Sequence, residues 1–208
     1  MPTVEQARAW YPDHDPVHGF DHILRVLALA ERLAASEGAD LEIVHAAALL
    51  HDVQLEPTRR ARHHLASAIF ARQVLQSEGW PDDRIEAVLH CIRAHRFRDD
   101  REQPNTLEAK VLFDADKLDA IGAIGVARAI AYAVQAGKPF YAPASPRFVL
   151  TGELEPGEVH SAYHEHLYKL VKIQARLYTP SGRKLGADRH AFMEIFFQQL
   201  QAEVSGER

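Results

Sequence analysis

Apolar residues recur at three- and four-residue intervals along almost the whole 208-residue chain. This spacing gathers them on one face of an α-helix, and no segment shows the convincing alternation of a half-buried strand. Glycine and proline separate the periodic segments. The pattern therefore predicts an all-α protein of about nine helices. The expected helices cover residues 4–10, 21–36, 41–52, 64–77, 81–94, 106–120, 121–136, 159–178 and 187–204.

The longest interruption, residues 137–157, contains four prolines and has no clear period, so we expect a loop there. A second interruption, the Thr-Pro-Ser-Gly sequence at 179–182, is expected to form a turn. Both interruptions lie inside the helical series. We therefore expect a single domain over residues 1–208.

Composition excludes several classes of protein. The net charge of −5 argues against general electrostatic binding of polymeric nucleic acid. No apolar run approaches the ~20 residues that a membrane span needs, and the first residues do not have the pattern of a secretory signal. The one cysteine, Cys91, cannot form an internal disulfide, which suits a reducing compartment. We expect a cytoplasmic protein, and its 13 histidines are compatible with metal chemistry.

Three expected helices direct a polar side chain toward the core. Each such side chain shares a helix face with apolar residues: His22 with Val26, Leu29 and Leu33; His51 with Leu41, Val44 and Ala48; Asp116 with Ala109, Leu112, Phe113 and Ala120. Buried imidazoles and carboxylates are costly unless they are paired or bind a metal. Asp114 lies ~200° around the helix from Asp116 and should point elsewhere. With Asp52, the set of two imidazoles and two carboxylates suits Mn, Fe, Co or Ni better than a thiolate zinc site.

The order His…His-Asp…Asp and its surroundings resemble the HD-domain superfamily of metal-dependent phosphohydrolases. The matching strings are HGFDHILRV at 18–26, AAALLHDV at 46–53 and DADKLDAIGA at 114–123. The resemblance covers roughly residues 5–205 and points to a bacterial branch of stand-alone HD proteins. It implies an HD-domain helical bundle with its metal-site core at about 18–122 and C-terminal helices at 158–205.

The resemblance also implies roles for individual residues. One divalent ion (Mn, Fe, Co, Ni or Mg) would be bound by His22, His51, Asp52 and Asp116. Catalytic roles are implied for three residues. Glu56 would act as a base on the attacking water, and Lys117 and His95 would lie near the phosphate. Substrate contacts are implied for Arg25 and His64. A second metal is not favoured, because Ala94 stands where relatives often carry another histidine.

Several of these residues also have structural interpretations. His95 would equally suit a core histidine bonded to a backbone carbonyl, and His64 a helix-start histidine with a structural partner. Arg25 would equally suit a surface salt bridge, and Lys117 a solvated lysine. Asp119 is expected to orient a ligand histidine. The late histidines are expected to be solvated or structural; they are His160, His164, His166 and His190.

The expected function is hydrolysis of a phosphate ester or phosphoanhydride. A nucleotide is the expected substrate class, since the superfamily favours nucleotides. No membrane partner is expected, and assembly as a homodimer stays open. Two alternatives remain: a di-iron oxygen-binding or oxygenase protein that uses residues such as His64 and His95, and a non-catalytic metal-containing sensor or binding module.

Overall fold

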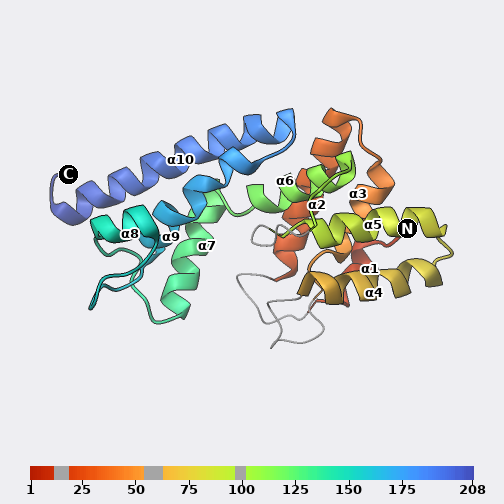
Figure 1. Cartoon of the computed structure of the whole chain (residues 1–208), viewed down its shortest axis with the longest axis horizontal. Coiled ribbons are helices and arrows are strands. Elements are labelled where there is room, and N and C mark those ends of the chain that lie inside the picture. Colours follow the sequence, from red (N-terminus) through yellow and green to blue (C-terminus); the bar gives the residue numbers. More distant parts are fainter. Residues whose placement is uncertain (12–18, 54–62, 97–101) are drawn as a thin grey trace. The chain divides into compact units, whose positions relative to one another are not determined.

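The computed structural model describes residues 1–11, 19–53, 63–96 and 102–208. This described part contains ten α-helices, two short 3-10 helices and no β-strand, which confirms the all-α prediction (Figure 1). The helices, in chain order, are α1 (Val4–Arg8), α2 (Phe20–Glu37), α3 (Leu41–Leu50), α4 (His63–Ser77), α5 (Asp82–Ala94), α6 (Leu107–Leu118), α7 (Gly122–Gln135), α8 (Pro146–Thr151), α9 (Ala162–Tyr168), η2 (Leu170–Lys172), η3 (Gln174–Arg176) and α10 (Pro180–Ser205).

The chain divides into two compact units. The first comprises Met1–Lys117 with Tyr178–Gly182, and the second comprises Leu118–Leu177 with Arg183–Arg208. The single domain over residues 1–208 stays a prediction. The residues expected to bind metal all belong to the first unit.

Helix α3 is the central helix of the first unit and packs against α2 and α5. Seven of its ten residues are buried; they are Ile43, Val44, Ala46, Ala47, Ala48, Leu49 and Leu50. Leu41 was expected on this buried face but is 50% exposed, because it is the first residue of the helix. The buried apolar residues of α3 thus fix its C-terminal end in the core, and His51 follows there as the C-cap.

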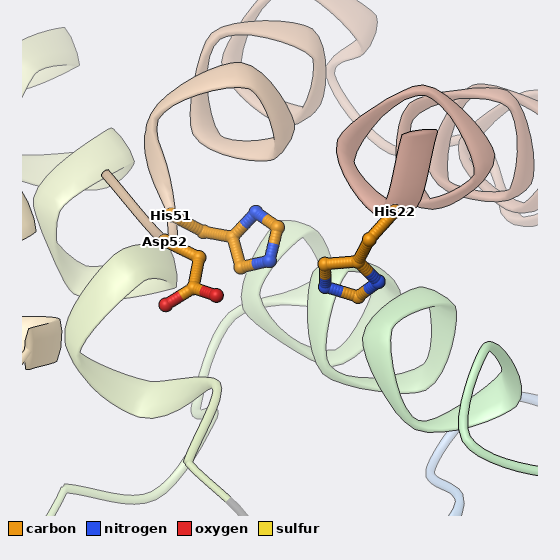
Figure 2. Close-up of side chains that lie close together, drawn as sticks. All are labelled: His22, His51 and Asp52. Atoms are coloured by element: carbon orange, nitrogen blue, oxygen red, sulfur yellow. The ribbon is translucent and has the colours of Figure 1, made fainter. Parts of the chain in front are cut away.

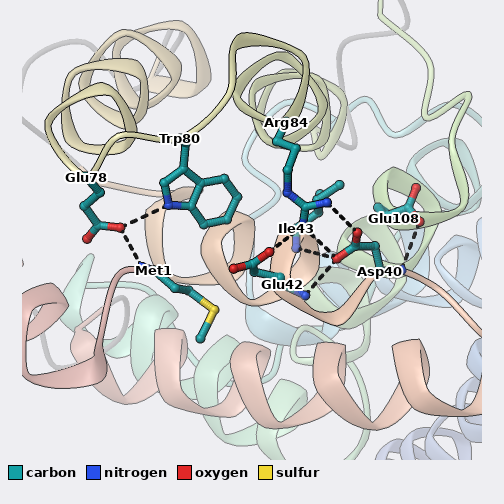
Figure 3. A network of polar contacts seen from close by, with 8 residues as sticks. All are labelled: Met1, Asp40, Glu42, Ile43, Glu78, Trp80, Arg84 and Glu108. Carbon is teal, nitrogen blue, oxygen red and sulfur yellow. Dashed lines mark hydrogen bonds and ion pairs between the residues drawn. The ribbon is translucent and has the colours of Figure 1, made fainter.

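Asp40 starts α3 by accepting hydrogen bonds from the backbone N–H groups of Glu42 and Ile43 at 3.0 and 3.2 Å. These donors have no partner within the helix, so an N-cap carboxylate stabilises its first turn. Arg84 of α5 donates to both oxygens of Asp40, at 3.0 and 3.2 Å (Figure 3). The N-cap therefore also ties α3 to α5.

Three sequence predictions about the C-terminal half need correction. Residues 137–157 are not all loop, because Ser145 caps α8 and Pro146 occupies its first turn. The helix expected at 159–178 is interrupted after Tyr168 and continues as the 3-10 helices η2 and η3. The expected turn at 179–182 is the start of α10: the Thr179 hydroxyl accepts from Gly182 N–H at 3.0 Å, and Pro180 takes the first helical position.

Within the described residues, no single helix has both the length and the hydropathy of a membrane span. In this part of the chain, one pair of helices, α6 and α7, passes that test when the two are counted together across the break between them.

Candidate metal centre

Side chains from two helices meet in the first unit. His22 lies in the first turn of α2, and His51 and Asp52 follow the last turn of α3. One potential ligand atom from each of the three lies within 4.8 Å of the others (Figure 2). Both imidazoles are buried, with ring centroids 5.5 Å apart. The described residues thus contain a group that could hold a metal ion.

The geometry of His51 suits a metal ligand. Its Nδ1 lies 2.8 Å from the carbonyl oxygen of Ala48, which can only accept. The neutral ring therefore carries its proton on Nδ1 and keeps a lone pair on Nε2. That Nε2 is buried and has no hydrogen-bond partner among the described residues. Burial also lowers the pKa of His51, so the ring is neutral near pH 7.

Asp116 of α6 adds a carboxylate to this group. Its Oδ1 lies 3.5 Å from His22 Nε2, and its Oδ2 accepts a hydrogen bond from the ammonium of Lys117 at 2.5 Å. Burial alone would raise the pKa of Asp116, but the positive charge of Lys117 and then the neighbouring histidines outweigh it. The pKa of Asp116 is consequently well below its usual range, and the group is a carboxylate at neutral pH.

Asp114 faces another part of the first unit. It is fully buried and accepts hydrogen bonds from the N–H groups of Tyr178 and Thr179, at 2.9 and 2.7 Å. The Thr179 hydroxyl donates to the same carboxylate at 2.7 Å. Position 182 must be glycine here, because a Cβ would overlap Asp114 Oδ2. Asp114 therefore holds the start of α10, while Asp116 two residues later faces His22.

Two residues that the sequence analysis missed hold the turn that carries His51 and Asp52. The Tyr11 hydroxyl donates to the carbonyl oxygen of Leu49 at 2.8 Å, and the Ser67 hydroxyl donates to that of Val53 at 3.1 Å. Both side chains are buried. Burial, and then the charge of Asp52, raises the pKa of Tyr11 well above its usual value, so its hydroxyl stays protonated. No motif marks either residue in the sequence.

Of the other expected site residues, His95 contacts the group directly. His95, at the C-cap of α5, packs edge-to-face on His51 with centroids 5.2 Å apart. Its Nδ1 lies 2.5 Å from the carbonyl oxygen of Ile92, as the structural interpretation expected, and burial lowers its pKa well below the usual value. His64 is buried in the first turn of α4, and Arg25 is half-buried one turn after His22. Glu56 lies outside the described residues.

Two further expectations concern residues of the second unit. The expectation that Asp119 orients a ligand histidine stays a prediction. Asp119 Oδ2 accepts a hydrogen bond from Arg128 of α7 at 2.7 Å. Among the late histidines, His164 is fully buried between Ser161 and Glu158, at 2.8 and 3.1 Å, which is a structural role.

The donor set fits a divalent metal ion. Two imidazoles and two carboxylates are ligands that first-row divalent metals accept. The buried lone pair on His51 Nε2 is costly in an apolar interior, and a bound cation would satisfy it. The cluster therefore has the chemistry of a metal site.

Comparison with known proteins agrees with this geometry. The HD domain family matches residues 19–121. The uncharacterized protein YpgQ of Bacillus subtilis is 34% identical over 99% of this chain and 96% of its own. The chain belongs to the HD domain superfamily.

Solved structures of similar proteins cover nearly the whole chain. The complex of Bacillus subtilis YpgQ with ADP has a TM-score of 0.74 at 32% identity, over 98% of this chain and 99% of that one. A Lactobacillus plantarum protein has a TM-score of 0.76 at 34% identity, over 99% and 100% of the two chains. An HD-superfamily hydrolase from Bacillus thuringiensis has a TM-score of 0.73 at 28% identity, over 97% and 96%.

Proposed function

We propose that the chain is a metal-dependent phosphohydrolase acting on a nucleotide, with His22, His51, Asp52 and Asp116 as the metal ligands. The observation that carries the proposal is the convergence of His22, His51 and Asp52 within 4.8 Å, with the buried Nε2 of His51 among them. Two relatives support it further. One was crystallised with ADP, a nucleoside diphosphate, and another is described as an HD-superfamily hydrolase.

The metal ion, when bound, would lower the pKa of a coordinated water and polarise a phosphoryl oxygen. The chain's own residues supply the rest. The Lys117 ammonium, held at Asp116, provides positive charge where a phosphate approaches the ligands. His95 keeps its proton on Nδ1 through the Ile92 carbonyl, so its ring is neutral and its Nε2 is a hydrogen-bond acceptor.

Three further residues complete the proposed site: Glu56, Arg25 and His64. Glu56, four residues after Asp52, is proposed as the base that takes a proton from the attacking water. Arg25 and His64 are proposed to contact the phosphorylated substrate. Arg25 lies on α2 three residues after His22, and His64 lies in the first turn of α4, which follows Asp52 in the chain. Their positive or hydrogen-bonding groups are the types that bind phosphate.

A metal analysis and a substrate screen test the proposal. The protein is purified without added metal, its bound metal is measured, and nucleotides are assayed for phosphate and pyrophosphate release with Mn²⁺, Co²⁺, Ni²⁺ and Mg²⁺. One metal ion per chain and metal-dependent release support the phosphohydrolase. Two iron ions with an iron–oxygen absorption band would favour the di-iron alternative. Bound metal without turnover of any phosphorylated compound would favour a sensor or binding module.

A further inference from the structure

One side chain contacts both helices that carry the histidine ligands, α2 and α3. The Tyr11 hydroxyl holds the Leu49 carbonyl at the end of α3, two residues before His51. Its ring packs on Phe20, the first residue of α2 and two residues before His22, with centroids 5.6 Å apart. Tyr11 therefore touches the chain just before each histidine of the cluster.

The hydroxyl contact has a specific physical role. The last carbonyl groups of a helix have no partner inside it, and a buried carbonyl needs a donor. Tyr11 supplies that donor for Leu49, while His51 itself bonds to Ala48. Ser67 holds the Val53 carbonyl on the far side of the His51–Asp52 pair. The turn is thus fixed on both sides by side chains from other segments.

We propose that Tyr11 is a positioning residue for the metal centre, where it sets the separation between His22 and the His51–Asp52 pair. This inference rests on the proposed function, because it requires these residues to bind a metal. An aromatic ring has only two rotatable bonds, and here it is buried against Phe20. The ring therefore holds the hydroxyl at a fixed place beside α2, and the hydroxyl bond to Leu49 fixes the end of α3 there. Ser67 has the supporting role of holding the turn at Val53.

Mn²⁺ binding to metal-stripped protein tests this role by calorimetry. Tyr11→Phe keeps the ring on Phe20 and removes only the hydroxyl bond that fixes the end of α3, so the protein should keep its helical circular dichroism. Its dissociation constant for Mn²⁺ should rise roughly 10-fold, with stoichiometry unchanged. Ser67→Ala should weaken binding a few-fold, by about the strength of one hydrogen bond. The matched control is Tyr163→Phe, which removes a phenol hydroxyl that contacts Gln201 at 3.4 Å in the second unit.

The outcomes separate this inference from the proposed function. If the wild type binds Mn²⁺ and Tyr11→Phe binds it within twofold as tightly, Tyr11 does not position the ligands. An equal loss of affinity in Tyr163→Phe would also overturn the inference, because the effect would not depend on the contact with α3. If the wild type itself binds no metal, the proposed metal centre fails, and the role of Tyr11 fails with it.

Discussion

Asp114 and Thr179 are joined by two hydrogen bonds although 65 positions separate them in the chain. The N–H and the hydroxyl of Thr179 both donate to Asp114 Oδ2, each at 2.7 Å. The pair links the helix that carries Asp116 to the residue that caps α10. It also fixes the rotation of α6, since Asp114 and Asp116 lie on different faces of that helix.

Asp114→Asn should destabilise the protein. The amide loses the charge, and its NH2 replaces one of the two oxygens that accept from Tyr178 and Thr179, so at least one buried donor loses its acceptor. We expect the free energy of unfolding to fall by about 2–4 kcal/mol. Urea denaturation followed by circular dichroism measures the change. Asp188→Asn, at an exposed position on α10, is the control and should change little; equal stability of the two variants would contradict the role of Asp114.

Lys117→Ala should separate metal binding from turnover. The ammonium contacts Asp116, and in the proposed mechanism it supplies charge for the phosphate rather than a ligand for the metal. We expect metal to remain bound while kcat/KM for the nucleotide falls, by roughly 10²-fold. Lys110→Ala, on the same helix, is the control and should keep its turnover. Loss of metal together with turnover would show that Lys117 supports the ligands instead.

The sequence predicted the all-α class and the inward direction of His22, His51 and Asp116, because helical periodicity determines which face a side chain occupies. Local capping sequences were harder to interpret. Thr179-Pro180 and Ser145-Pro146 have the composition of turns, yet both pairs start helices, since proline fits the first helical position. Tyr11 and Ser67 could not be found, because their bonds to Leu49 and Val53 depend on tertiary packing that no local pattern encodes.

Glu158 should make the second unit sensitive to acid. It accepts hydrogen bonds from the N–H groups of Ser145 and Glu155, and His164 lies 3.1 Å away. These contacts lower its pKa from 4.5 to about 2, with the backbone bond from Glu155 the largest cause. A depressed carboxyl pKa stabilises the fold above the unfolded value, and that stabilisation is lost as the pH falls from about 4.5 toward 2.

Glu158→Gln tests this pH dependence. The variant should be less stable than the wild type near neutral pH. The difference between their free energies of unfolding should become smaller as the pH falls to about 3. Urea denaturation midpoints, measured for the wild type and the variant between pH 7 and about 3, give the stability of each protein as a function of pH. A difference that stays constant down to the acid end would show that the ionised carboxylate contributes nothing to stability.

The most direct test of the metal centre is to measure Mn²⁺ binding and nucleotide hydrolysis on the same preparations of wild type, His51→Ala and Asp52→Ala. His190→Ala, on α10, is the control for loss of a histidine elsewhere. The apolar helices hold the fold, so both site variants should keep their helical circular dichroism. They should lose bound metal and Mn²⁺-dependent hydrolysis together, while the wild type and His190→Ala retain both. Site variants that hydrolyse the nucleotide as fast as the wild type would contradict the metal-dependent phosphohydrolase.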